Sequence, residues 1–394
     1  MIEEKKKPVY TRNKKKEKAW WRLANDWFHL WVGIVSGIPV VLISLTGCLL
    51  VFQKEITELS RPWWNVENLG KENLLPPSEV RRQVEQQLPD MHIRRFWYYG
   101  DDAPVKITPD NSDSLIYANP YTGEILALVD HEDFFHEVDE GHRNLWLPPE
   151  IGRPVVSWAT LIFGLMLLTG VVLWWPKKWN KRHRKQAFTI NWKAKWKRIN
   201  YDLHNVLGFY SLLLGLLMAF TGLIMGFVIV RESVFSALGG EKSINAAVHE
   251  IEKWPNHVPT DEWKKVDEIW YKVIGEIAQR NPLEISIHFP HDTDSAIYAC
   301  TDMDGGTWRV LFFDRENLSL MSNSQRPMNQ EDVANWFMRA NYGLHTGYIG
   351  GLLTKWIYFF ASLVCASLPI TGFYVWLGKK KKKKKRFQIN QYPT

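Results

Sequence analysis

The sequence predicts a mainly α-helical membrane protein built from a unit of two spans with an outward α+β module between them, written twice. Three observations lead to this class: four long uncharged apolar stretches, basic runs that fall on one side of the membrane, and repeated short motifs. The net charge of +7 comes from segments that flank the apolar stretches. We therefore expect contact with membrane lipid and no nucleic-acid partner.

Each apolar stretch is long enough to form a transmembrane helix. About 20 residues cross a hydrocarbon core that is about 30 Å thick. Helices in soluble cores are usually shorter and keep a polar face. The first stretch is too long for a cleavable signal peptide, and no small-residue cleavage site follows it. The predicted spans are residues 27–52, 154–175, 203–230 and 356–378.

Lysine and arginine set the expected orientation. Basic segments occupy residues 1–26, 176–202 and 379–394, and cytoplasmic loops carry an excess of these residues. With four spans, all three segments lie in the cytoplasm. We expect a multi-pass protein with both termini cytoplasmic and with residues 53–153 and 231–355 outside.

Each half of the chain contains two copies of a pattern in which a histidine is followed by a Thr-Gly pair. "NDWFHLWVG" and "NYDLHNVLG" both place asparagine four residues before a histidine and glycine four residues after it. The histidine precedes a threonine by 17 residues in spans one and three, and by 27 or 26 residues at spans two and four. These pairs are His29–Thr46, His204–Thr221, His142–Thr169 and His345–Thr371.

The outward segments repeat as well. In the first, the amphipathic "PPSEVRRQVEQQLPD" leads into short alternating strands and a hairpin at "NPYTGE". In the second, "DEWKKVDEIWYKVIGEIAQRNP" leads into three strands with a turn at "FDREN". Both read as small α+β modules. Because the topology of the two halves is the same, an axis near the membrane normal should relate them.

This ordered set of motifs resembles the PepSY-associated transmembrane family over nearly the whole chain. The carrying features are the histidine at the start of the first span, the outward module, and "TGVVLW" or "TGFYVW" closing the second span. The resemblance implies two periplasmic PepSY-like modules in a bacterial inner-membrane protein. Members of this family include reductases of siderophore-bound iron that carry haem between the spans.

The repeat groups four histidines into two candidate ligand pairs. His29 with His204 lie at the cytoplasmic span starts, and His142 with His345 lie at the periplasmic approaches. Neutral imidazole is a common haem ligand, and ionisable residues at spans mark function. We expect two bis-histidine b-type haems, bound non-covalently because no C-x-x-C-H occurs. Zinc needs three or four ligands, and a proton relay needs acidic residues that the spans lack.

Two kinds of glycine site accompany these histidines. Gly33 and Gly208 lie one helical turn beyond His29 and His204. They leave room either for a porphyrin edge or for close packing of two helices. The Thr-Gly pairs allow the same two interpretations, of which packing is favoured.

The sequence holds few pointers to a substrate. His131 and His136 fall in the acidic segment 130–142, which is either a docking surface for a metal complex or a solvated linker. Arg94 and Arg95 would suit an anionic ligand. The aromatic strands around them form either a binding platform or module core.

These features predict a membrane-bound ferric-chelate reductase that passes electrons through two haems to a periplasmic ferric siderophore or other chelate. No G-x-G-x-x-G follows a strand, so the electron donor is expected to be a cytoplasmic reductase, a reduced flavin or a quinol. No acid–base catalytic residue is identified. Two alternatives stay open: a haem-free PepSY binding or regulatory protein, and a transporter of siderophore-like ligands.

Overall fold

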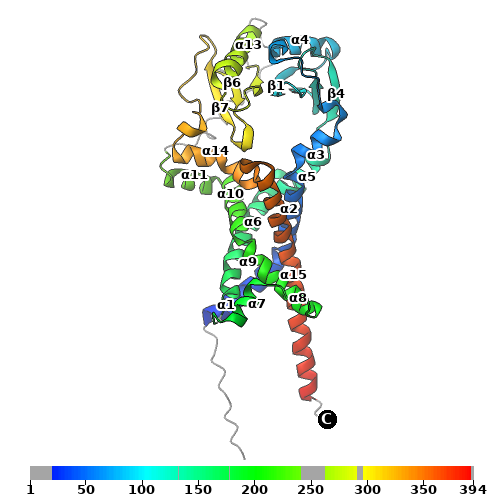
Figure 1. Ribbon diagram of the computed structural model, residues 1–394, viewed down its shortest axis with the longest axis vertical. Helices are drawn as coiled ribbons and strands as arrows, with labels where there is room; N and C mark the ends of the chain where they lie inside the picture. Colours follow the sequence, from blue (N-terminus) through cyan, green and yellow to red (C-terminus); the bar gives the residue numbers. More distant parts are fainter. Residues whose placement is uncertain (1–19, 132, 177, 241–261, 291–295, 392–394) are drawn as a thin grey trace, which may run out of the picture.

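The computed structural model describes residues 20–131, 133–176, 178–240, 262–290 and 296–391. The molecule is elongated, with a helical bundle at one end and a head of one sheet and two helices at the other (Figure 1). Most of the predicted basic N-terminal segment lies outside the described residues.

Two pairs of long helices make the bundle. α15 packs along α2, and α10 packs along α6. Two segments, Pro149–Trp174 and Tyr348–Gly378, are long and apolar enough to cross a membrane as they stand. The first covers the predicted span 154–175 up to Trp174, and the second contains the predicted span 356–378. The bundle helices are α1 (Trp20–Val35), α2 (Gly37–Leu50), α6 (Pro149–Trp174), α10 (Leu212–Gly226) and α15 (Gly351–Gln391).

The spans predicted over residues 27–52 and 203–230 correspond to bent helix pairs that end at Leu50 and Gly226, and residues 228–230 belong to the separate helix α11 (Val228–Ala237). α1 meets α2 at 60° across Ser36, and the helical segment Trp196–Tyr210 meets α10 at 62° across Ser211. Each bend lies seven residues after the histidine of its motif. The number of spans is four if each bent pair crosses as one unit.

The first bend has a cause in the sequence. Pro39 has no N–H for the carbonyl of Val35, and its ring would clash with that carbonyl in a continuous helix. The Ser36 hydroxyl instead donates to the carbonyl of Val32 at 2.8 Å. The second bend has no proline and follows the π-helical turn η3 (Leu203–Leu207). Such turns are rare in proteins, and those that occur are often found at functional sites.

Short helices cover both ends of the bundle (Figure 1). α3, α5, α11 and α14 lie near the head, and at the opposite, distal end α7 lies beside α1 and α8 lies beside α15. Their bounds are α3 (Gln53–Ser60), α5 (Phe134–Asn144), α7 (Lys181–Phe188), α8 (Trp196–Asp202), α9 (Gly208–Tyr210), α11 (Val228–Ala237) and α14 (Val333–Thr346). Shorter turns are η1 (Pro62–Trp64), η2 (Lys71–Asn73), η4 (Val273–Ile277), η5 (Asp304–Gly306), η6 (Met328–Gln330) and η7 (Tyr348–Gly350).

The two predicted modules share one antiparallel sheet. Its order is β4-β3-β2-β1-β5-β6-β7, so the first strand of each module pairs with the other at the centre. The sequence predicts two separate modules, because an alternating apolar pattern identifies a strand but not the strand with which it pairs. The strands are β1 (Ile93–Tyr99), β2 (Val105–Pro109), β3 (Ser114–Ala118), β4 (Ile125–Asp130), β5 (Glu284–His288), β6 (Ala296–Thr301) and β7 (Arg309–Asp314).

One face of this sheet forms the core of the head. Alternation along β1 buries Phe96 and Tyr98, and the ring of Tyr98 lies 5.3 Å from that of Trp270. Two helices, α4 (Pro77–Gln87) and α13 (Glu262–Lys272), cover this face on the side away from the bundle (Figure 1). The other face is turned toward the bundle.

The central β1–β5 pairing can be tested by cross-linking. Tyr99 and Glu284 are direct Cα partners, and Cα atoms of such partners lie about 4.5–5.5 Å apart, within disulfide range. The double variant Tyr99→Cys/Glu284→Cys should therefore cross-link on mild oxidation. The diagonal pair Trp97→Cys/Glu284→Cys should not. Peptide mapping by mass spectrometry under non-reducing conditions reports both. The reverse outcome would exclude this register.

Candidate functional site

Four histidines meet in two pairs, one at each end of the bundle. The distal pair is His29 of α1 and His204 of η3, with ring centroids 6.4 Å apart and an interplanar angle of 75°. The head-side pair is His142 of α5 and His345 of α14, at 6.2 Å and 64°. Each pair takes one histidine from each half of the chain. The structure thus brings together the members of both predicted pairs.

In the distal pair, a threonine on a facing helix contacts each ring. His29 Nδ1 lies 2.9 Å from Thr169 Oγ1 of α6. His204 Nδ1 lies 3.0 Å from Thr371 Oγ1 of α15 and 3.1 Å from the Leu368 carbonyl oxygen. Both threonines belong to the Thr-Gly pairs.

The head-side pair is held in the same way. His142 Nδ1 lies 2.9 Å from the Ile43 carbonyl oxygen and 3.2 Å from Thr46 Oγ1 of α2. His345 Nδ1 lies 2.9 Å from Thr221 Oγ1 of α10. All four Thr-Gly pairs therefore contact one histidine each, and always a histidine of their own half.

The threonine hydroxyls fix the histidine tautomer. A hydroxyl carries one proton, and in each case it is donated to a carbonyl of the threonine's own helix, leaving oxygen lone pairs to accept from the ring. Nδ1 is therefore the protonated nitrogen, and the lone pair of each neutral imidazole is on Nε2. The donated bonds are Thr46 to Leu42, Thr169 to Met166, Thr221 to Leu217 and Thr371 to Ser367.

The glycine of each Thr-Gly pair makes room for the ring. A Cβ added at any of these four positions would lie 3.1–3.3 Å from the Cε1 atom of the bound histidine, tighter than an ordinary carbon contact. The sequence favoured general helix packing for these pairs, whereas the structure gives each glycine a specific contact with an imidazole. The contacts are Gly47 with His142, Gly170 with His29, Gly222 with His345 and Gly372 with His204.

At three of the four sites, an asparagine four residues before the histidine helps to hold the histidine–threonine contact. Its side-chain amide donates to the main-chain carbonyl of the threonine that holds that histidine. The bonds are Asn25 to Thr169 at 3.3 Å, Asn200 to Thr371 at 3.0 Å and Asn341 to Thr221 at 3.2 Å. Val138 takes this position before His142, so the fourth site lacks this bond. The repeated spacing signals these residues, although it does not say what they contact.

Gly33 and Gly208 lie against the facing helices. A Cβ at Gly33 would lie 3.4 Å from Met166 Sδ, and one at Gly208 would lie 3.5 Å from Leu368 Cδ2. Both are ordinary van der Waals distances. A role for these glycines in clearing space for a ring stays a prediction.

Burial keeps the head-side pair neutral. Removal from water lowers the pKa of His142, and it lowers the pKa of His345 to about 4, with a smaller contribution from the neighbouring His142. Both rings are therefore unprotonated on Nε2 at neutral pH, as a metal ligand must be.

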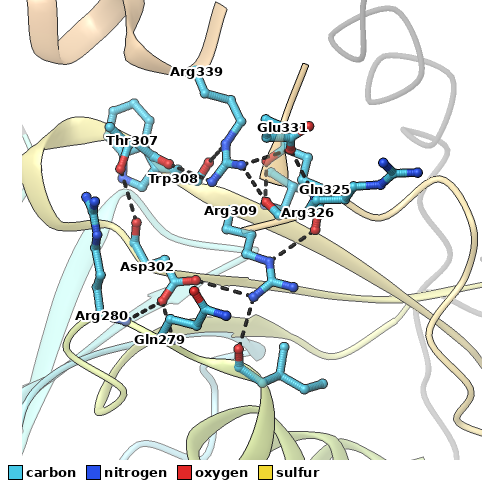
Figure 2. A network of polar contacts seen from close by, with 12 residues as sticks. Gln279, Arg280, Asp302, Thr307, Trp308, Arg309, Gln325, Arg326, Glu331 and Arg339 are labelled. Carbon is cyan, nitrogen blue, oxygen red and sulfur yellow. Dashed lines mark hydrogen bonds and ion pairs between the residues drawn. The ribbon is translucent and has the colours of Figure 1, made fainter. Parts of the chain in front are cut away.

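A buried arginine network anchors the helix that carries His345 to the head. Figure 2 shows Arg339 of α14 reaching the loop before β7. Its guanidinium donates to the carbonyls of Thr307 and Trp308 at 3.0 Å and pairs with Glu331 at 2.9 Å. In the same network Arg309 pairs with Asp302 at 3.4 Å. The position of the head is therefore tied to the position of the histidine.

The predicted substrate residues do not form one site. Arg94 pairs with Asp110 at 2.7 Å and is nearly buried. Arg95 lines a cavity in the head. The ring centroids of His131, which precedes α5, and His136, in its first turn, lie 4.9 Å apart. Within the described part of the chain, no three histidine, cysteine, aspartate or glutamate side chains gather as a metal site.

The motifs of this bundle coincide with a known family. A family model described as the PepSY-associated TM region matches residues 27–379. The chain belongs to this family. No curated protein matches it. Membership of the PepSY-associated TM region family supports a membrane protein, and the matched range includes all four histidines and all four Thr-Gly pairs.

The histidine–threonine contact can be tested at Thr221. The Thr221→Val variant leaves the buried Nδ1–H of His345 without this acceptor, which costs about 1–3 kcal/mol. In detergent, this variant should unfold at a lower temperature than the unaltered protein. Thr160→Val is the matched control, because the Thr160 hydroxyl donates to Val156 within its own helix. Equal loss of stability in the two variants would contradict the assigned hydrogen bond.

Proposed function

We propose that this protein transfers electrons across a membrane through two b-type haems, one between each histidine pair, to a ferric siderophore or other ferric chelate. The observation that carries the proposal is the contact between Nδ1 and a threonine hydroxyl that all four histidines share. Each ring donates from Nδ1 to a fixed acceptor, which orients Nε2 as the ligand nitrogen. A purely structural histidine has no need of the same arrangement four times.

The spacing within the pairs fits an iron between two imidazoles. Metal–imidazole bonds are about 2.0–2.1 Å, and a ring centroid lies about 1.1 Å behind its nitrogen, so two opposed ligands put the centroids about 6.3 Å apart. The observed values are 6.4 and 6.2 Å. Haem needs only two protein ligands, whereas zinc needs three or four. The absence of larger ligand groups among the described residues supports haem over a bare ion.

The protein's own groups hold the ligands at fixed distance and orientation. The threonine hydroxyl accepts from Nδ1, the adjoining glycine leaves space for the ring, and the asparagine side chain bonds the threonine carbonyl. Bound haem supplies one-electron iron chemistry at a potential set by its ligands and surroundings. The two histidines of each pair would hold the haem between them and leave no position open for the acceptor, which would receive its electron while bound elsewhere on the protein. Each ferric ion takes one electron and becomes ferrous.

The two pairs lie at different depths of the bundle. The distal pair contacts Thr371 of α15, whereas the head-side pair contacts Gly47, which lies beside Ser362 of α15. Nine helical residues separate these levels, or about 14 Å along the axis. This is roughly half of a hydrocarbon core about 30 Å thick. Two haems would divide the crossing into shorter steps.

The proposed direction follows the basic segments. The distal end is then cytoplasmic and the head periplasmic, in a bacterial inner membrane. The donor is a cytoplasmic reductase, a reduced flavin or a quinol, and it meets the distal pair. The acceptor meets the head side.

Haem content tests the ligand assignment. The purified protein should contain two haems, measured as the pyridine haemochrome per protein. Single changes to alanine at His29, His204, His142 or His345 should each remove about half of the haem, because one axial ligand of one site is lost. His183→Ala should retain both haems, since this side chain bonds Asn180 on the surface of α7. Four variants with unaltered haem would exclude the pairing.

Re-oxidation by a chelate tests the function. Protein reduced with dithionite, then freed of excess reductant, should return to the oxidised spectrum when a ferric chelate is added, and ferrous iron should appear in equal electron equivalents. Gallium(III) chelates, which accept no electron, should leave the spectrum reduced. A purified protein without haem would leave the haem-free binding protein as the better interpretation.

A further inference from the structure

The bundle-facing side of the sheet contains a cavity of about 460 Å³. Its lining comes from the adjacent strands β2, β1, β5, β6 and β7, so both halves of the chain contribute. Since side chains alternate along a strand, Trp97 lies opposite the core face that holds Phe96 and Tyr98. The lining includes Arg95, Trp97, Lys106, His288, Tyr298 and Trp308.

Lys106 is the notable charge in this cavity. Its Nζ lies 4.8 Å from the ring centroid of Trp97 and 5.9 Å from that of Tyr99. Among the residues that the structure describes, no carboxylate pairs with it. Burial, together with a smaller contribution from the charge of Arg61, lowers the pKa of Lys106 to about 8. An anion in the cavity would restore the favourable environment that the ammonium group lacks.

The remaining lining supports an anionic, partly planar ligand. Arg95 lies on the neighbouring strand, where Trp97 pairs with Lys106 and Arg95 pairs with Thr108. None of the described lining residues is acidic. Trp97, Tyr298 and Trp308 add aromatic surface.

A chain of contacts leads from the cavity to the head-side histidines. The ring of Trp308 lies 4.8 Å from the ring of Tyr342 on α14. Tyr342 precedes His345 by three residues on that helix, and Arg339 bonds the Trp308 carbonyl (Figure 2). A ligand in the cavity is thereby held close to the helix of a proposed haem ligand.

We propose that this cavity binds the acceptor of the electron, and that the acceptor is an anionic ferric chelate held by Lys106 and Arg95 against the aromatic wall. Its identity as the acceptor rests on the proposed function. The binding of an anionic chelate rests on the cavity alone. Neutral and cationic hydroxamate chelates gain nothing from the two cations and bind more weakly.

Binding is tested with gallium(III) citrate, an anionic chelate that accepts no electron. Titration calorimetry on the full-length protein should give a dissociation constant that rises about tenfold or more in Lys106→Gln, because a charge-assisted contact is lost. Lys106→Arg should stay within a few-fold of the unaltered protein. Arg82→Gln, an exposed cation on the opposite side of the head, should leave binding unchanged. Thermal unfolding confirms that each variant is folded.

The outcomes separate the two proposals. Equal affinity of Lys106→Gln and unaltered protein for gallium citrate, or tighter binding of a cationic gallium trihydroxamate, would overturn the cavity assignment even if haem is present. Lys106-dependent binding in a protein without haem would support the cavity and overturn electron transfer. Re-oxidation of reduced haem by ferric citrate should show a raised KM and an unaltered kcat in Lys106→Gln.

Discussion

The hydrogen bond from a histidine Nδ1 to a threonine hydroxyl on a facing helix is the constraint on which the bundle depends. It occurs four times, always within one half of the chain. The ring lies so close to the threonine's helix that a Cβ in place of the adjoining glycine would be 3.1–3.3 Å from Cε1. The bond also decides which ring nitrogen bears the proton, and so directs Nε2 toward the other half. The same hydrogen bond therefore positions the helices and orients the nitrogen that would bind a metal.

The two halves need one another at three levels. A single half supplies one histidine to the distal pair, one to the head-side pair and one central strand to the sheet. Association of the halves completes all three, at His29–His204, at His142–His345 and at β1–β5. The buried Arg339 then ties the head-side pair to the sheet, so movement of the head would reach the α14 histidine.

The sequence predicted the pairing of the histidines well, because equal spacing in the two halves marks equivalent positions. It did not predict which threonine holds which ring. Thr46 follows His29 by 17 residues, yet it contacts His142, since helix crossing decides the contact. The bend at Ser36 could have been predicted from Pro39, whereas the equivalent bend at Ser211 has no proline to signal it. Likewise, strand alternation located β1 and β5 but could not reveal that they pair.

Low-temperature electron paramagnetic resonance of the oxidised protein tests the central claim most directly, because it reports the axial ligands of each haem iron. Two imidazoles on each iron predict two low-spin ferric signals that together account for two haems per chain. A His142→Ala variant should retain the signal of the distal site alone. High-spin ferric haem in the unaltered protein, or no haem signal at all, would contradict ligation by the two histidine pairs.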